Sequence, residues 1–280
     1  MTDQARELRA LAQGAPVAPT DEVGTPVYVV ASGKGGVGKS VLATLLADGF
    51  AAAGARVLLV DGAQNLGHLN VLTGVAVGGR LEQVLRGETD PASLVVPVTE
   101  RLWLLPSDSG AEALYALPAV DQARLHHRLA ALYADYDLIV VDAGAGIETV
   151  IRLATMGGTR VVLVTVPEVA ALTDSYAVIK LVHAQLPGLP IDVVVNRAVD
   201  PEEVPRAFER LSVAAGRFLG RQLNLLGGIS EAPGLREAMR RPGGLFSDLR
   251  LEGLRREVRA MSKTLARSDG SASVAAGGAA

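Results

Sequence analysis

A run of glycines and lysines early in the chain has the spacing of a phosphate-binding loop. Residues 33–40 read Gly-Lys-Gly-Gly-Val-Gly-Lys-Ser and match G-x-x-x-x-G-K-[ST] at every fixed position. Glycines let successive backbone N–H groups converge on phosphate oxygens, and a following helix adds its positive amino end. Lys39 would reach the outer phosphates, and the Ser40 hydroxyl would be a ligand of Mg²⁺. The candidate nucleotide-binding residues here are Gly33, Lys34, Gly35, Gly36, Val37, Gly38, Lys39, Ser40 and Val41.

A second metal-binding group follows a later apolar run. The segment Leu-Ile-Val-Val at 138–141 ends in Asp142, about 100 residues after the loop. A buried strand ending in an acid is the form expected of an aspartate that holds Mg²⁺ through a water molecule. A strand simply capped by an aspartate would look the same, but the full loop upstream favours the metal role. Asp142 therefore joins Ser40 as a candidate magnesium residue.

Short apolar runs that must position these groups alternate with helix-length segments. They lie at 27–31, 56–60, 102–105, 138–141, 160–166, 191–195 and 223–226. Nearly continuous Val, Ile and Leu without alternation indicates parallel strands covered on both faces. The pattern predicts an α/β fold, a doubly wound and mostly parallel sheet with helices on both faces, and a ligand site beyond the carboxyl ends of the strands.

The chain divides into four parts by composition. Residues 1–13 predict a short polar helix, 14–26 a Pro- and Gly-containing linker, and 27–267 one domain that ends in an amphipathic helix. A chain of 280 residues with 49% hydrophobic residues is long enough to bury one sizeable core. Residues 268–280, made of Ser, Gly and Ala with Asp269, predict a disordered tail.

Composition excludes several classes of function. The formal net charge of −3 gives no global attraction to nucleic acid or anionic lipid. The sequence has no cysteine, which excludes disulfides, thiolate catalysis and metal clusters held by its own thiolates. Its four histidines lack metal-ligand spacing and are expected on the surface. The early charges and the lack of an apolar stretch of about 18 residues predict a cytoplasmic protein.

The loop carries a second lysine, Lys34, that the general motif does not require. The resulting K-G-G-V-G-K-S resembles the deviant Walker A loop of the MinD/ParA group of P-loop ATPases. In that group this lysine reaches the nucleotide of the partner subunit, so the resemblance implies ATP as the cofactor and an ATP-dependent homodimer. It also implies catalytic roles for Lys34 and Lys39. A solvated loop lysine is the alternative.

Residues 61–74 are similar to the group's D-x-D-x-G-L-x-N-x-D-x-x-x-G segment, matching it at Asp61, Leu66 and Gly74. The resemblance makes Asp61 a catalytic candidate. The second aspartate, which orients the attacking water in the family, is replaced by Ala63. Losing that group should slow hydrolysis and leave nucleotide binding nearly intact, unless the neighbouring Gln64 takes over the role.

Three further segments resemble the group. Residues 142–147 are similar to its D-T-G-A-G-I switch, with Ala143 in place of the threonine and a hydroxyl lost near the γ-phosphate. Residues 167–180 match P-E-x-x-A-L-T-D-A-Y-A-x-I-K, a stretch shared by the FlhG and MinD families, almost throughout. Asn196 and Arg197 stand where the family reads the adenine edge, although an asparagine in a plain loop would look alike.

The amino terminus resembles the FlhG family of flagellar regulators in particular. Residues 3–9 match D-Q-A-x-x-L-R, the helix with which that family docks on the signal-recognition-type GTPase FlhF. The resemblance makes an FlhF-like GTPase the expected partner. The partner-binding residues it implies are Asp3, Gln4, Ala5, Leu8 and Arg9.

A helix at 251–267 has one apolar and one basic face. Leu251, Leu254, Val258, Met261 and Leu265 fall at spacings of three and four. The basic face comprises Arg255, Arg256, Arg259, Lys263 and Arg267. Such a helix either lies on the anionic inner surface of the cell membrane, as the family's terminal helices do, or packs its stripe on the protein's own core; the second is favoured.

The leading expectation is an ATP-dependent switch that regulates flagellar placement or number. A scaffold that binds ATP without hydrolysing it is the alternative supported by Ala63 and Ala143. A ParA-like ATPase that positions DNA or cargo is a third possibility. It would need a basic surface patch for phosphate contacts, and the overall charge makes DNA the less expected partner.

Overall fold

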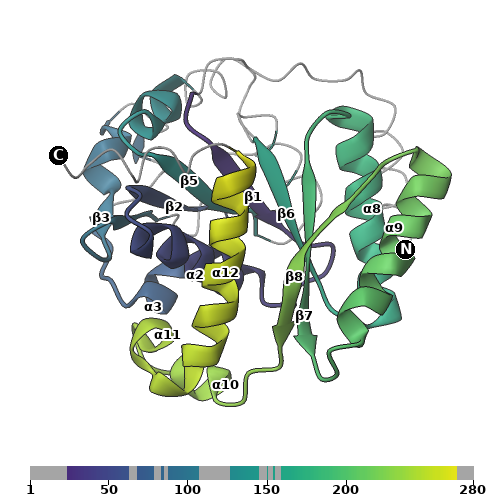
Figure 1. Ribbon diagram of the computed structural model, residues 1–280. Coiled ribbons are helices and arrows are strands. Elements are labelled where there is room, and N and C mark those ends of the chain that lie inside the picture. The colour runs from purple at the N-terminus through teal and green to yellow at the C-terminus, as the bar shows by residue number, and fades with distance from the viewer. Residues whose placement is uncertain are drawn as a thin grey trace.

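An eight-stranded sheet forms the centre of the computed structural model, which describes residues 24–62, 68–78, 83–84, 88–106, 127–144, 150, 154 and 159–269 (Figure 1). The strand order is β3-β4-β2-β5-β1-β6-β7-β8. The strands are β1 (Val27–Ala31), β2 (Val57–Asp61), β3 (Val96–Pro97), β4 (Leu102–Leu105), β5 (Leu138–Asp142), β6 (Arg160–Thr165), β7 (Ile191–Ala198) and β8 (Asn224–Ser230). All neighbouring strands pair in parallel except β3 and β4, which confirms the predicted fold class.

All seven predicted strands are present, and two of them run three or four residues further than the sequence suggested. β7 continues to Ala198 and β8 to Ser230, because polar and glycine residues take part in these strands near their carboxyl ends. The two-residue β3 was not predicted. Its pairing with β4 involves only Val96 and Pro97, which is too short a segment to give a hydrophobic pattern.

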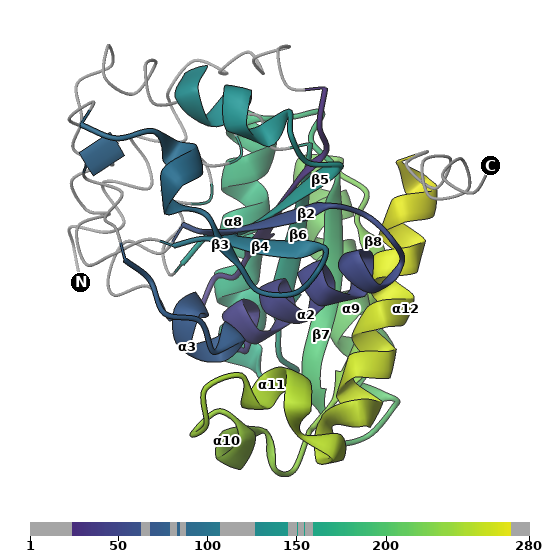
Figure 2. The ribbon, with the colours of Figure 1, turned by 90° about the vertical axis from the view of Figure 1, so that its left-hand side faces the viewer.

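Helices cover both faces of the sheet (Figure 2). One face carries α2 (Lys39–Ala52), α3 (Leu69–Thr73), α10 (Leu235–Ala238), α11 (Gly244–Ser247) and α12 (Glu252–Ser268). The other carries α8 (Val169–Gln185) and α9 (Glu203–Leu219). Two 3₁₀ turns, η1 (Pro91–Leu94) and η2 (Leu249–Leu251), are also present, and residues 127–133 are helical as well. Residues of the central strands alternate between the two cores, and every position of β1 is buried.

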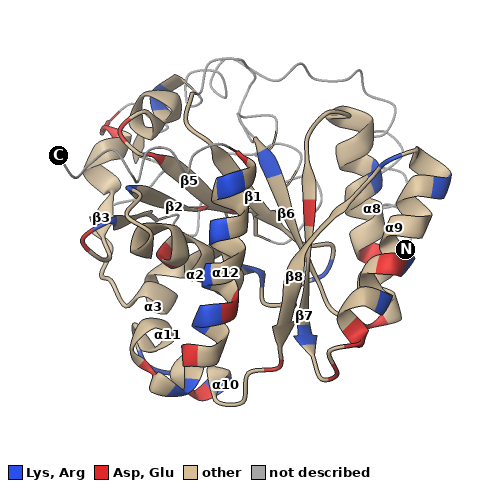
Figure 3. Ribbon diagram, in the orientation of Figure 1, with Lys and Arg blue, Asp and Glu red and all other residues tan. Residues whose placement is uncertain are grey.

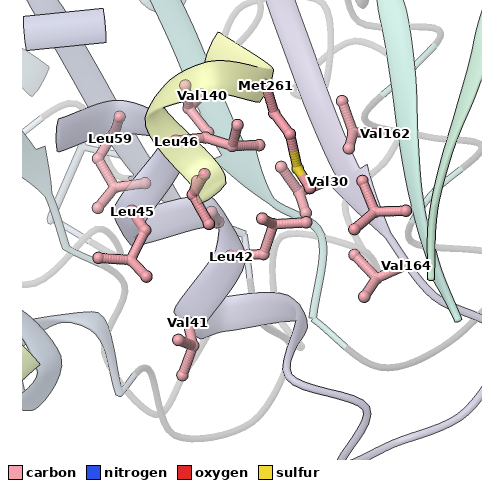
Figure 4. Packing of buried hydrophobic residues seen from close by; sticks show 14 of the residues in the cluster. Val30, Val41, Leu42, Leu45, Leu46, Leu59, Val140, Val162, Val164 and Met261 are labelled. Atoms are coloured by element: carbon pink, nitrogen blue, oxygen red, sulfur yellow. The ribbon is translucent and has the colours of Figure 1, made fainter. Parts of the chain in front are cut away.

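The core beside α2 joins the central strands to the last helix (Figure 4). Leu42, Leu45 and Leu46 of α2 pack with strand valines and with Met261 of α12. Full burial of such a side chain contributes roughly 1.5–3 kcal/mol. The two helices approach closely at Gly49, where an added Cβ would lie 2.4 Å from Ser262 Oγ. The helix that follows the phosphate loop is therefore packed directly against the carboxyl-terminal helix.

The amphipathic helix packs on the protein's own core. Leu254, Val258, Met261 and Leu265 are all buried in the cluster with α2. Basic residues mark the length of α12 in Figure 3, and Arg256, Lys263 and Arg267 are exposed. Membrane contact through the apolar stripe would require α12 to leave its place. No helix of the described ranges has the length and apolarity to cross a bilayer.

Two details of this region differ from expectation. Arg255 does not belong to the exposed basic face: it is buried, pairs with Glu252 at 2.8 Å and donates to the carbonyl of Leu245. The predicted disordered tail is wrong at its first two residues. Ser268 ends α12, and the Asp269 carboxylate accepts hydrogen bonds from Arg160 and from the Tyr28 hydroxyl, each at 2.5 Å.

The predicted amino-terminal helix 1–13 and nearly all of the linker 14–26 lie outside the described residues, as do residues 270–280. The described part of the chain begins at Gly24. The next residue, Thr25, donates a hydrogen bond from Oγ1 to the carbonyl oxygen of Tyr133 at 3.2 Å.

Candidate functional site

The phosphate-loop motif forms the connection between β1 and α2. Gly38 is the N-cap of α2 and has a φ of 93°, a conformation that side chains other than glycine rarely adopt. An added Cβ at this position would lie 2.3 Å from Asn196 Nδ2. Both the backbone and the neighbour therefore require glycine at the start of the helix, so that Lys39 and Ser40 enter its first turn.

The start of the loop lies against helix α8. A Cβ added to Gly33 would lie 2.2 Å from the carbonyl carbon of Asp174 and 2.6 Å from the Ser175 nitrogen. Ser175 is buried, and its hydroxyl donates to Thr165 Oγ1 at 2.9 Å. The segment 167–180, which the sequence related to the FlhG and MinD families, is thus part of the wall of the phosphate loop.

A buried ion pair forms the floor of the site. Lys39 Nζ donates to Asp142 Oδ1, and the two residues are 8% and 2% exposed. Asp142 ends β5 in register with Asp61 at the end of β2, and the Gly62 N–H donates to the Asp142 carbonyl at 2.9 Å. The predicted lysine and metal aspartate are therefore brought together where parallel strands end, as the fold rule requires.

A cavity of about 760 Å³ opens above this floor. Its walls include Ser32, Gly35, Gly36 and Ser40 of the loop, Gly144 after β5, Asn196 and Arg197 of β7, and Ser230 and Glu231 at the end of β8. A Cβ added to Gly35 or Gly36 would meet nothing within 4 Å, so the loop faces open space on this side. The volume and the polar groups at its base suit a nucleotide.

Lys34 lies on the rim of the loop and is paired. Its Nζ is 3.0 Å from Glu168 Oε2, and the two side chains are 43% and 66% exposed. An exposed pair of this kind contributes about 0–1 kcal/mol. The pair links the second lysine of the loop to the Pro-Glu step before α8, and Lys34 keeps a largely exposed side chain.

Asn196 and Arg197 brace the loop. Asn196 Nδ2 donates to the Val37 carbonyl at 2.7 Å, while its Oδ1 accepts from the Arg197 N–H at 2.9 Å. Arg197 has a φ of 57° and donates to the Gly36 carbonyl at 2.7 Å. Both ends of the Asn196 amide are thus occupied within the protein. The hydrogen bonds of Asn196 and Arg197 hold the carbonyls of the phosphate loop. To bind the adenine edge, the Asn196 amide would have to give up its hydrogen bonds to Val37 and Arg197.

Asp61 is buried beneath the start of α3. Its Oδ2 accepts from the Leu69 N–H at 3.4 Å, so it lies behind the floor of the site. Ala63 and Gln64, the positions on which the hydrolysis argument depends, lie outside the described residues. Ala143 is fully buried, and its N–H donates to the Val30 carbonyl at 3.0 Å. The methyl group that replaces the family's threonine therefore packs into the core.

Sequence reasoning missed three residues of the site. Glu168 was noted only as part of a motif, although it holds Lys34. His68 was expected on the surface, and it is exposed, but it also lines the cavity. Its place in the segment 61–74, which resembles a family motif, could have indicated this. The Ser230 hydroxyl donates to Glu257 of α12 at 3.0 Å. No signal linked these two, because they come from separate elements.

The fold and this arrangement define a P-loop nucleotide-binding domain of the deviant Walker A type. Residues 28–242 match the family model of the CobQ/CobB/MinD/ParA nucleotide binding domain. The chain belongs to this family.

Curated relatives include two flagellar proteins. The chain is 29% identical over 223 residues to the antiactivator FleN of Pseudomonas aeruginosa, covering 79% of this chain and 80% of FleN. It is 31% identical over 232 residues to the flagellum site-determining protein YlxH of Helicobacter pylori, covering 80% and 78%. Both similarities confirm the resemblance to the FlhG (FleN) branch of the MinD/ParA group.

Solved structures of MinD share the fold. The MinD in the MinC:MinD complex of Aquifex aeolicus has a TM-score of 0.70 at 27% identity, covering 86% of this chain and 95% of that one. MinD of Pyrococcus horikoshii, solved with Mg-ADP, has a TM-score of 0.70 at 25% identity, covering 89% and 98%.

Proposed function

We propose that the chain is an ATP-dependent switch of the FlhG type, a monomer without ATP and a dimer with it, that regulates flagellar placement or number. The similarity to FleN and YlxH over about 80% of the chain supports the flagellar role. The position of Lys34 carries the dimerisation part of the proposal. This cation lies on the exposed rim of the loop, whereas Lys39 lies on its floor.

The residues of the cavity fit ATP with Mg²⁺. The N–H groups of Gly35 through Val41 would bind the phosphates together with Lys39, and Ser40 with Asp142 would hold the metal, the aspartate through water. Bound Mg²⁺ offsets the phosphate charge. Lys39 now pairs with Asp142, so binding requires this lysine to exchange a carboxylate for phosphate oxygens. The carboxylate and the phosphate oxygens are both anionic, so the positive charge of Lys39 is compensated before and after the exchange.

Lys34 is weakly held and can be released to act across a dimer interface. Its side chain is 43% exposed and is held by a single exposed carboxylate, so releasing it costs at most about 1 kcal/mol. A phosphate chain carries far more charge than one carboxylate. The lysine would therefore transfer from Glu168 to a nucleotide held by a second copy of the chain, and the nucleotide would hold the dimer together.

Hydrolysis is proposed to be slow. Ala63 removes the carboxylate that would orient the attacking water, and Ala143 removes a hydroxyl near the γ-phosphate. Positioning and charge stabilisation supply most of the rate in phosphoryl transfer, so both changes lower turnover more than affinity. Gln64 is the residue that would restore positioning if turnover is brisk, because glutamine orients water in other nucleotide hydrolases.

A scaffold that uses ATP only as a structural ligand is the second candidate. The observation that favours it is the burial of Ala143, whose methyl group fills core space and leaves no hydroxyl on this segment for the nucleotide. The ParA-like alternative has less support, because the net charge of −3 does not favour DNA.

The proposed partner is an FlhF-like GTPase that binds the amino-terminal residues 3–9, and the proposed place of action is the cytoplasm. Contact with the inner face of the membrane remains a prediction for residues 251–267. It would use the exposed Arg256, Lys263 and Arg267, or it would require α12 to expose its buried stripe.

The test is ATP turnover of the purified protein with Mg²⁺, together with its molar mass with and without ATP. Wild type is expected to dimerise on ATP and hydrolyse it slowly, and Ala63→Asp is expected to raise turnover. Lys34→Ala should bind ATP and stay monomeric. A wild type that stays monomeric with ATP would overturn the switch, while unchanged turnover in Ala63→Asp would favour the scaffold.

A further inference from the structure

A second polar cavity lies at the opposite edge of the sheet from the nucleotide site. It has a volume of about 280 Å³ and is bordered by the end of α8, the loop 187–190 and the start of β8. Ile191 borders it at the first residue of β7, whereas Asn196 of the nucleotide site is five residues further along the same strand. Five strand residues span roughly 16 Å, so the two cavities are separate.

Arg221, which lines this cavity, is a buried cation without a carboxylate partner. Only 8% of the residue is exposed. One terminal nitrogen donates to the Pro187 carbonyl at 3.1 Å and the other to the Leu189 carbonyl. Its Nε is buried and has no hydrogen-bond partner. Within the described ranges, no Asp or Glu side chain forms an ion pair with this guanidinium.

Comparison with the other buried arginines shows that this is unusual in the molecule. Arg160 is 8% exposed and lies between Asp192 at 2.7 Å and Asp269 at 2.5 Å. Arg255 is 6% exposed and pairs with Glu252. Of the three arginines buried in the described part of the chain, Arg221 alone lacks an acid. A buried charge is costly unless an opposite charge compensates it.

The acid–base behaviour of these groups agrees with that difference. Desolvation by burial lowers the pKa of Arg221. At Arg160 the same desolvation is outweighed by hydrogen bonds and charge from Asp192 and Asp269, and the pKa is raised. The environment of Arg221 therefore lacks the negative charge that the fold supplies to its other buried guanidinium groups.

The remaining lining residues are donors or neutral groups. His183 Nδ1 is buried and has no partner in the described structure, and Gln222 and Asn224 add side-chain amides. The described lining contains no Asp or Glu. Arg221 has five N–H groups, of which two are used on the loop carbonyls, so its fork is fixed in place while donors remain.

We infer that this cavity binds a small oxyanion of the phosphate type. A planar, positioned guanidinium matches the geometry of phosphate oxygens, and an anion would offset the uncompensated charge of Arg221. The space also admits a substituent on the phosphate, so the oxyanion comes either from free phosphate or from a phosphomonoester. The site shares no residue with the nucleotide cavity and does not depend on the proposed function.

The experiment is a titration of the full chain with inorganic phosphate and, separately, with O-phosphoserine, followed by ¹H–¹⁵N spectra. Binding at the cavity should shift the Gly188 and Gly220 amides and the side-chain amide of Asn224. Phosphate in the nucleotide loop would instead shift Gly36 and Gly38, so the two sites are resolved in one spectrum. Shifts with both ligands indicate a phosphomonoester site, and shifts with phosphate alone a free-ion site.

Three variants decide the role of Arg221. Arg221→Lys keeps the charge without the fork and should weaken binding roughly tenfold, while Arg221→Gln should abolish it. Arg210→Gln, which removes an exposed arginine of α9, is the matched control and should bind as wild type. Asn224→Asp places a carboxylate in the cavity and should raise Tm and remove the phosphate shifts, even if Arg221→Gln fails to fold.

The inference is overturned by any of three results. The first is shifts that stay confined to the nucleotide loop. The second is cavity shifts that persist in folded Arg221→Gln, and the third is phosphate binding that Asn224→Asp leaves unchanged.

Discussion

The amino group of Lys39 and the carboxylate of Asp142 form a buried ion pair that closes the floor of the nucleotide cavity. Each residue supplies the other's only compensating charge among the contacts that the structure describes for this pair. Both belong to the machinery proposed for phosphate and Mg²⁺. Removing one partner would leave the other as a buried charge alone, and the nucleotide binding proposed above requires the pair to break.

We predict that Asp142→Asn and Lys39→Met each destabilise the nucleotide-free protein by about 3–5 kcal/mol, because each leaves one buried charge alone. The double variant Lys39→Met with Asp142→Asn should be closer to wild type, since it removes both charges. The measurement is the free energy of unfolding in urea. A double variant as unstable as the sum of the single variants would contradict the prediction.

Gly38→Ala should damage both the fold and the loop. The position has a φ of 93°, and the new Cβ would lie 2.3 Å from Asn196 Nδ2, which itself holds the Val37 carbonyl. Strain of this kind costs about 1–3 kcal/mol, and ATP affinity should fall because the loop carbonyls move. Gly35→Ala is the matched control for stability, because its Cβ would meet nothing within 4 Å. Thermal unfolding and ATP titration measure both effects; equal stability of the two variants would refute the argument.

The features that the sequence predicts well are those that leave a local pattern. β1 and β5 are buried at every position, so their sequences are unbroken apolar runs, which in β5 end at Asp142. Two glycines of the loop 33–40 are required by their neighbours, because a Cβ at Gly33 would meet the backbone of α8 and one at Gly38 the amide of Asn196. These signals identified the fold, the phosphate loop and Asp142.

Contacts between distant segments leave no such pattern. Glu168 holds Lys34, Asp269 holds Arg160, and Asn196 holds Val37, each across more than 100 residues. Arg255 follows Leu254 at the edge of the apolar stripe, and the carbonyls of Leu245 and Asp248 accept its hydrogen bonds on the inner side. Such side chains are placed by tertiary packing, which a single sequence does not show.

Acid should weaken the region around α11 and α12. Hydrogen bonds from the Arg250 side chain and backbone hold the pKa of Asp248 well below its usual range, and hydrogen bonding by Arg255 lowers the pKa of Glu252. A lowered folded-state pKa contributes stability above the unfolded pKa of about 4, and this is lost as pH falls through the folded value. Stability should therefore decline below about pH 4.

Asp248→Asn should flatten that decline, because the variant has no carboxylate to protonate at this position. Urea unfolding at pH 7 and at about pH 3 measures the difference. Glu209→Gln, which removes an exposed carboxylate of α9, is the control and should keep the wild-type pH dependence. An Asp248→Asn variant that loses as much stability in acid as wild type would show that other carboxylates are responsible.

The pairing of Lys34 with Glu168 leads to the last prediction. The two side chains are exposed, and their 3.0 Å contact must break before Lys34 can reach a nucleotide in a second copy of the chain. Glu168→Gln removes the competing carboxylate and should tighten ATP-dependent dimerisation by up to about thirtyfold, because a dimer breaks two exposed pairs that are each worth at most about 1 kcal/mol. Lys34→Ala should abolish dimerisation while leaving ATP binding to the monomer, because Lys39 and the loop amides remain. Molar mass at a series of protein concentrations with ATP measures both variants. Glu202→Gln is the control, because Glu202 is an exposed carboxylate at the start of α9 that does not line the nucleotide cavity. A Lys34→Ala variant that still dimerises with ATP would show that the rim lysine does not bridge the two copies, whatever Glu168→Gln does.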